Sequence, residues 1–181
     1  MRLSTAADRD DDRSVAVIRA ALDAGATLLD TADAYCHGEH DVGHNERLIA
    51  RALEGWTGDP GRITVATKGG MRRPGGAWGT DGRAKHLRDA CDASRGALGV
   101  DSIDLYQLHA VDPRTPIETG VRALARLREE GRIRELGLCN VTVSQIREAR
   151  AIVPPDSDKL SAGRGPRTAR GLRRLVHRSR T

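Results

Sequence analysis

The sequence predicts an α/β fold in which parallel strands alternate with helices. Four short, largely apolar runs recur at intervals of about 33 to 40 residues, enough for a strand, a helix and two loops in each repeat. The four runs are residues 27–30, 63–67, 103–108 and 136–139. Strands separated by helical segments form parallel sheets with right-handed crossovers.

The segments between these runs have the three- and four-residue apolar spacing of amphipathic helices. In chain order, the segments are residues 15–22, 48–53, 87–98, 117–127 and 146–152. Gly131 is expected to end the fourth helix, because glycine tolerates the left-handed conformation that closes helices. Thr142 and Gln145 form a capping box that predicts the start of the fifth.

Polar residues follow the four runs at the points where the strands should end. Asp30 closes the first run and is followed by Tyr35, while Lys68, His109 and Asn140 directly follow the other three. The carboxyl ends of parallel strands meet at one edge of a sheet, and in (β/α) barrels this edge carries the active site. The sequence therefore predicts that these five side chains form one reaction centre.

Four motifs resemble the aldo-keto reductases in order and spacing, from about residue 1 to residue 153. They are residues 29–35 (LDTADAY), 66–68 (ATK), 103–109 (IDLYQLH) and 137–140 (GLCN). One such motif alone is weak evidence, but four in register are specific. The resemblance implies a TIM (β/α)8 barrel and reversible, NADPH-dependent reduction of aldehydes and ketones to alcohols. Family members usually have serine where this chain has Cys139.

The resemblance also implies a role for each residue. Asp30, Tyr35, Lys68 and His109 would form the catalytic tetrad; Asn140 would contact the nicotinamide carboxamide, and Asp30 would also lie beside the cofactor. Hydride transfer to a carbonyl carbon puts negative charge on the oxygen, which then needs a proton. A tyrosine hydroxyl ordinarily has a pKa of about 10, and a neighbouring ammonium favours its phenolate. We therefore expect Tyr35 to be the acid, Lys68 its cationic neighbour, Asp30 the anchor of that lysine, and His109 the residue that orients the substrate oxygen.

Each of these residues also has an ordinary structural interpretation. Asp30 and Asn140 can be turn residues, Tyr35 a packing residue, Lys68 a solvated strand end and His109 a buried histidine. The joint pattern favours a site over five separate structural roles. Tyr106, within a strand, we assign to packing.

Metal binding is an alternative use of the loop that follows Tyr35. Cys36, His37, His40 and His44 lie within it, but tetrahedral sites usually draw ligands from two separated pairs. We predict no metal site here, and expect the loop to border the substrate pocket. The three cysteines have no disulfide-like spacing, which suits a reducing compartment.

Residues 69–82 form a glycine-rich stretch between the second apolar run and the next helix. The stretch contains Arg72, Arg73 and Trp78 but no dinucleotide or P-loop glycine pattern. We expect a flexible loop that forms a wall of the pocket.

The chain of 181 residues is short for a TIM barrel, which typically needs about 250. With residues 1–4 interpreted as the end of a first strand, the sequence predicts a partial barrel of about five of the eight β/α units. Residues 1–153 would form this truncated barrel, and residues 154–181 an unrelated tail rich in arginine. The tail could be a disordered extension, a nucleic-acid-binding arm or the product of a shifted reading frame. We favour the last, because it begins where a sixth strand is due.

These observations predict a cytoplasmic enzyme whose substrate is a small carbonyl compound. No apolar run is long enough to cross a membrane, and the N-terminus lacks the pattern of a signal peptide. Nucleic acid is not an expected partner, since the tail lacks aromatic residues for base stacking. An incomplete barrel would have open sheet edges, through which chains could self-associate, and reduced cofactor binding, which places its activity in question. The alternative function is that of a non-catalytic, cofactor-sensing regulatory subunit, although a pure binding protein has no need of both Tyr35 and Lys68.

Overall fold

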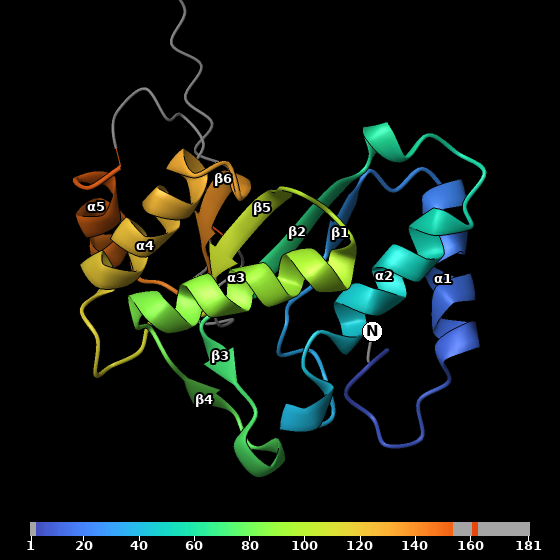
Figure 1. The fold of residues 1–181 in the computed structure, drawn as a ribbon, viewed down its shortest axis with the longest axis horizontal. Helices are drawn as coiled ribbons and strands as arrows, with labels where there is room; N and C mark the ends of the chain where they lie inside the picture. The colour runs from blue at the N-terminus through green and yellow to red at the C-terminus, as the bar shows by residue number, and fades with distance from the viewer. Residues whose placement is uncertain (1–2, 154–160, 163–181) are drawn as a thin grey trace, which may run out of the picture.

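The computed structural model describes residues 3–153 and 161–162 of the chain. Their main feature is a parallel five-stranded sheet with the strand order β1-β2-β5-β6-β7 (Figure 1). The strands are β1 (Leu28–Asp30), β2 (Thr64–Gly69), β5 (Ile103–Leu108), β6 (Ile133–Leu138) and β7 (Ser161–Ala162). This topology confirms the predicted α/β class.

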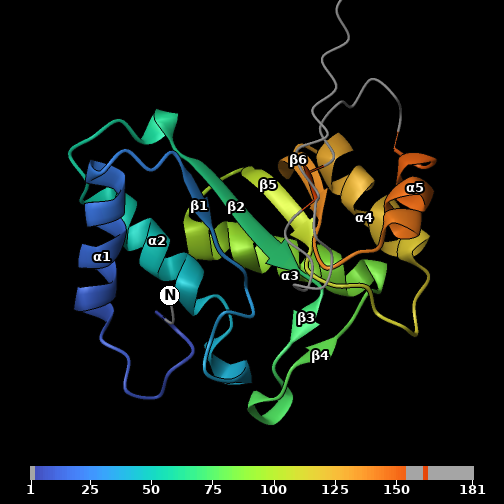
Figure 2. The same ribbon diagram turned by 180° about the vertical axis from the view of Figure 1, so that it is seen from behind.

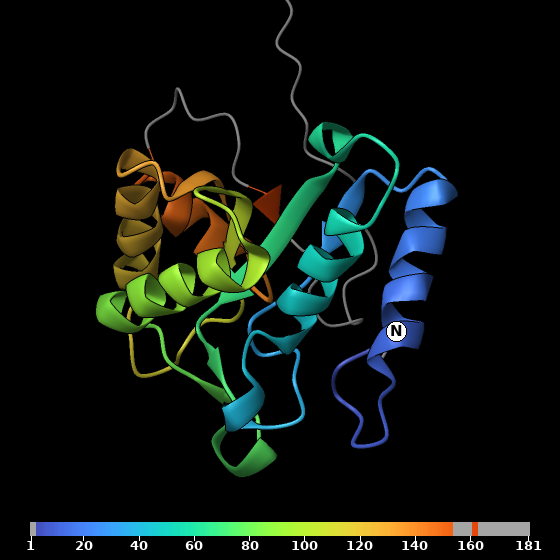
Figure 3. The same ribbon diagram turned by 45° about the vertical axis from the view of Figure 1, so that its right-hand side comes forward.

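Helices cover one face of the sheet, which Figures 1 and 2 show from opposite sides. They are α1 (Asp11–Asp23), α2 (His44–Glu54), α3 (Ala84–Leu98), α4 (Ile117–Glu129) and α5 (Val143–Arg150). Figure 3 shows α1 to α4 arranged in an arc around the strands. Among the described residues, no helix is long and apolar enough to cross a membrane.

Helix boundaries agree with the local sequence signals. Asp10 caps α1 by accepting a hydrogen bond from the Arg13 amide, and the predicted Thr142–Gln145 capping box opens α5. Gly131, with φ of 71°, follows the end of α4 as expected. The fifth helix ends at Arg150, two residues before the predicted end.

The core lies between the sheet and the helices, and alternate residues of the strands point into it. Tyr106 and Leu108 on β5 point to the helical side, where both are almost fully buried with Leu87 of α3 and Leu124 of α4. The Tyr106 hydroxyl donates to the Leu87 carbonyl at 3.5 Å. This contact confirms the packing role predicted for Tyr106.

Strand register brings the predicted polar residues to one end of the sheet. Asp30 pairs with Ala66 in β2, and Lys68 lies opposite Gln107 in β5. Because the strands are parallel, their carboxyl ends all point towards the same side (Figure 2). The residues that follow β5 and β6 therefore lie near Lys68.

Three local expectations differ from the structure. The glycine-rich stretch contains a short antiparallel hairpin, formed by β3 (Met71–Arg72) and β4 (Gly79–Thr80). The sequence did not predict this hairpin, because its strands are only two residues long and show no apolar alternation. Residues 3–6 form bends rather than the end of a strand. Strand β6 begins three residues before the predicted run, because two charged residues, Arg134 and Glu135, separate Ile133 from that run.

The predicted tail lies mostly outside the described residues. Within it, Ser161 and Ala162 form β7 and pair in parallel with Gly137 and Leu138 of β6. A further parallel strand thus follows α5.

A glycine substitution in β2 tests how tightly the sheet packs on α3. A Cβ atom on Gly69 would lie 1.9 Å from the hydroxyl of the buried Tyr106. We expect Gly69→Ala to lower the free energy of unfolding by about 1–3 kcal/mol. The control is Gly96→Ala in α3, where a Cβ meets nothing within 4 Å; it should raise stability by about 0.5–1 kcal/mol. Urea unfolding of both variants measures the difference, and equal effects would contradict the packing described.

Candidate active site

Lys68, near the end of β2, lies at the centre of the predicted site. Its side chain is 3 % exposed. The ammonium Nζ donates to Asp30 Oδ2 at 2.9 Å, to the Thr31 carbonyl at 2.7 Å and to the Tyr35 hydroxyl at 3.4 Å. A buried ammonium needs such partners, because leaving water unpaired is costly.

Asp30 forms the ion pair with Lys68 and has a second partner. Gln107 Nε2 donates to Asp30 Oδ1 at 3.4 Å, so both carboxylate oxygens have a hydrogen bond. The Asp30 side chain is 53 % exposed, in contrast to the buried lysine. The sequence analysis did not predict Gln107, although this residue lies on the same face of the sheet as its strand partner Lys68.

Tyr35 and His109 lie on the open side of Lys68. The two rings meet edge to face, with centroids 5.5 Å apart, and the Lys68 Nζ is 4.9 Å from the centroid of Tyr35. Burial, and secondly the positive charge of Lys68, lower the pKa of His109 to about 4. The imidazole is therefore neutral at physiological pH. Its buried Nδ1 has no hydrogen-bond partner in the described part of the chain.

Asn140 is the second residue after β6 and adopts a left-handed backbone conformation, with φ of 54°. Its Nδ2 donates to the His109 carbonyl at 2.8 Å and to the Cys139 sulfur at 3.4 Å. These contacts fix the amide plane of an otherwise exposed side chain. The structure thus brings Asp30, Tyr35 and Lys68 together with His109, and it places Asn140 beside the histidine.

A buried hydrogen-bond network supports the Thr31 carbonyl that binds Lys68. Thr31 Oγ1 donates to Asn45 Oδ1 at 2.7 Å, Asn45 Nδ2 donates to Ser4 Oγ at 2.8 Å, and Ser4 Oγ contacts the His44 ring at 2.9 Å. The N-terminal segment and α2 are thereby connected to the lysine. Backbone carbonyls leave no signature in a sequence, so this part of the site could not be predicted.

Two residues of the cysteine- and histidine-rich loop have hydrogen-bond partners within the protein. Cys36 is buried and its thiol donates to the Ala34 carbonyl at 3.5 Å, while His44 contacts Ser4 and Asp11. Among the described residues, no three histidine, cysteine or acidic side chains are placed to hold one ion.

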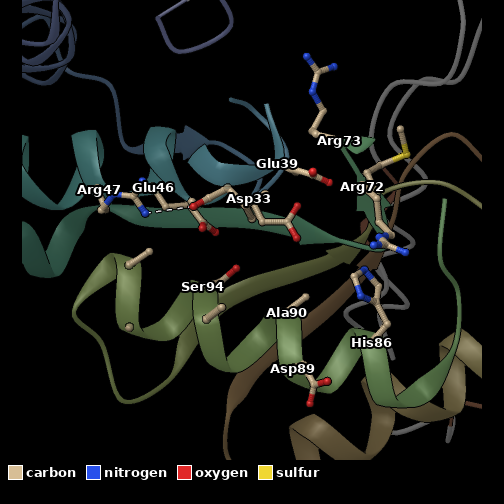
Figure 4. A pocket seen from close by; sticks show the side chains of 16 residues that line it. Asp33, Glu39, Glu46, Arg47, Arg72, Arg73, His86, Asp89, Ala90 and Ser94 are labelled. Carbon is tan, nitrogen blue, oxygen red and sulfur yellow. Dashed lines mark hydrogen bonds between the residues drawn. The ribbon is translucent and has the colours of Figure 1, made fainter. Parts of the chain in front are cut away.

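A cavity of about 590 Å³ lies on the helical side of the sheet, between α2 and α3 (Figure 4). Glu46 and Asp33 face it, and burial raises the pKa of both carboxyl groups. The buried Glu46 accepts a hydrogen bond from the Thr67 hydroxyl on β2. None of the five predicted site residues lines this cavity, which is therefore separate from the candidate active site.

The low pKa of His109 predicts a specific pH dependence of stability. Its folded-state pKa of about 4 lies below the ordinary 6.5, so the unfolded chain binds more protons between these pH values. The free energy of unfolding should therefore rise by about 3 kcal/mol between pH 4 and pH 7 on account of this group. Urea unfolding of His109→Gln across this range should lack that part of the rise.

The control is His40→Gln, which replaces an exposed histidine and leaves His109 in place, so the part of the rise that His109 causes should remain. A wild-type pH profile in His109→Gln would contradict a neutral, buried imidazole.

Known proteins share this arrangement of strands. A model of the aldo/keto reductase family matches residues 1–169, which extends beyond the predicted domain boundary at residue 153. The structure resembles a glycerol dehydrogenase from Gluconobacter oxydans, with a TM-score of 0.74 and 35 % identity over 84 % of this chain and 46 % of that protein. It also resembles the holo form of an aldo-keto reductase from Bacillus halodurans, with a TM-score of 0.67 and 32 % identity over 81 % of this chain and 46 % of the other.

The chain thus spans just under half the length of both neighbours. Its open parallel sheet, with helices on one face, corresponds to part of their barrels, as the sequence predicted. The family match, the fold and the two structural likenesses together show that the chain belongs to the aldo/keto reductase family.

Proposed function

We propose that this chain carries the catalytic half of an NADPH-dependent oxidoreductase that interconverts small carbonyl compounds and alcohols. The observation that carries this proposal is the contact of one buried ammonium, Lys68, with both Asp30 and Tyr35, while a neutral His109 lies beside the tyrosine. The alcohol chemistry named for the glycerol dehydrogenase neighbour supports the reaction class.

In the proposed reaction, Tyr35 donates a proton to the substrate oxygen. The ammonium of Lys68, 3.4 Å from the tyrosine hydroxyl, stabilises the phenolate that remains. Asp30 and the Thr31 carbonyl hold that ammonium, and neutral His109 donates a hydrogen bond that orients the carbonyl oxygen. General acid catalysis of this kind contributes about 10²- to 10⁴-fold to a rate.

The residues present fit the nicotinamide end of the cofactor, which supplies the hydride when bound. Asn140 is exposed at the strand end, and within the described residues its Oδ1 makes no hydrogen bond. That oxygen can accept from a carboxamide, while Nδ2 is already fixed by His109. Asp30 faces the same open side. The holo-form neighbour supports a nicotinamide cofactor, and the choice of NADPH rests on the family resemblance.

We also propose a cytoplasmic location for this chain. The cysteines Cys36, Cys91 and Cys139 are buried and unpaired, which fits a reducing compartment.

A non-catalytic, cofactor-sensing role is the alternative function. Such a protein would bind the cofactor but would not require a proton donor with an adjacent ammonium. The contact between Lys68 and Tyr35 therefore favours the enzyme.

Substitution of Lys68 tests the enzyme directly. Lys68→Met should lower kcat for carbonyl reduction by at least about 100-fold, because the phenolate loses its cation. The control is Lys85→Met, which removes an exposed lysine that pairs with Asp89 and should leave kcat unchanged. Turnover is followed by loss of NADPH absorbance, and binding by NADPH fluorescence.

Three results distinguish the functions. Turnover that depends on Lys68 supports the reductase, saturable NADPH binding without turnover supports the sensing role, and absence of both contradicts the two proposals together.

We also propose that β1 mediates self-association. In residues 3–153 and 161–162, β1 has a strand neighbour only on the β2 side, and its Leu28 is 56 % exposed. An unpaired apolar edge is a template for pairing with another chain. Leu28→Lys should shift the chain towards the monomer in sedimentation equilibrium; a monomeric parent, or identical association in both, would contradict this role.

A further inference from the structure

The β3–β4 hairpin places Arg73 opposite Trp78. Arg72 pairs with Gly79 in the antiparallel register, so the next pair along the hairpin is Arg73 with Trp78. The guanidinium Cζ of Arg73 lies 4.0 Å from the centroid of the Trp78 ring, within the range of a cation–π contact. One face of the indole is therefore covered by arginine.

Arg73 also joins the hairpin to the loop that carries Tyr35. Its Nη2 donates to the His37 carbonyl at 3.2 Å, two residues beyond the tyrosine. Arg73 is 7 % exposed, although it lies on a surface hairpin. A buried guanidinium that contacts two separate segments restrains both of them.

Trp78 in turn lies against the candidate active site. Its ring meets His109 edge to face, with centroids 6.5 Å apart and an interplanar angle of 73°. His109 contacts Tyr35 in the same manner, so the three rings form a row. Trp78 is 53 % exposed, which leaves much of the indole available to a ligand at the site.

We propose that Arg73 is a positioning residue, which fixes Trp78 as a wall of the substrate side of the site. This inference rests on the proposed function and deepens it. Strands of two residues hold a hairpin weakly by themselves. The contacts of Arg73 with the indole and with the His37 carbonyl supply the missing restraint. The organic part of a carbonyl substrate then meets a fixed aromatic surface beside His109.

The neighbouring Arg72 provides a matched control. Successive residues of a strand face opposite sides. Both arginines line the cavity between α2 and α3. The exposed Arg72 points towards His86, whereas the side chain of Arg73 extends in the opposite direction (Figure 4). Arg72→Met therefore removes the same charge and shape without affecting Trp78.

Fluorescence quenching tests the position of Trp78 without any need for turnover. In a Trp56→Phe background, Trp78 is the sole tryptophan of the 181-residue chain. Arg73→Met should raise its acrylamide quenching constant about two-fold, because one of the two indole faces loses its cover. Arg73→Lys should restore part of the protection, and Arg72→Met should match the parent. Equal quenching in parent and Arg73→Met would overturn the proposal.

Kinetics then test the consequence for the substrate. Arg73→Met should raise KM for the carbonyl substrate about 5- to 20-fold and change kcat less than about two-fold, because the proton-donating residues stay in place. An unchanged KM, or a loss confined to kcat, would overturn the role in substrate binding. If the parent shows no turnover, the proposed function fails, and the quenching result alone decides whether Arg73 fixes Trp78.

Discussion

The burial of the Lys68 ammonium is the constraint on which the site depends. Burial of a charged side chain that is only 3 % exposed is costly unless close partners replace the water that it loses. The structure supplies a carboxylate, a backbone carbonyl and a tyrosine hydroxyl. Those three groups come from β1 and the segment that follows it, so the lysine also connects β2 to its neighbour at the end of the sheet that carries the candidate site.

The partners of Lys68 form further hydrogen bonds with more distant segments. Thr31 is connected to Ser4 by hydrogen bonds through Asn45, and Asp30 accepts a hydrogen bond from Gln107 of β5. Polar groups at a strand end are accessible to water unless neighbouring elements cover them, and here the N-terminal segment does so: Ser4 is 1 % exposed. The bend at residues 3–6 is thus part of the support of the site, although no strand forms there.

The sequence was sufficient to predict the α/β class and which polar side chains lie together at one end of the sheet, because strand ends in a parallel sheet are specified by a simple pattern. Asp30, Lys68 and His109 each follow an apolar run, and the runs recur at the spacing of β/α units. The β3–β4 hairpin escaped prediction, since its strands are two residues long and its turn uses glycines. The contact of Lys68 with the Thr31 carbonyl could not be predicted, because every residue has a backbone carbonyl. Gln107 could have been predicted from the alternation of side chains along a strand, which places it on the same face of the sheet as Lys68.

The ammonium of Lys68 acts on His109 in the same direction as burial. Its positive charge disfavours a second positive charge on His109, which burial already keeps neutral, with a pKa of about 4. In the proposed reaction, the same ammonium, 3.4 Å from the Tyr35 hydroxyl, stabilises that oxygen once it has given up its proton. A neutral imidazole can donate one hydrogen bond without competing for the proton that the tyrosine gives. In the proposed function, the proton donor is thus the residue whose hydroxyl contacts the cation, and the orienting donor is the residue that burial, together with the cation, keeps neutral.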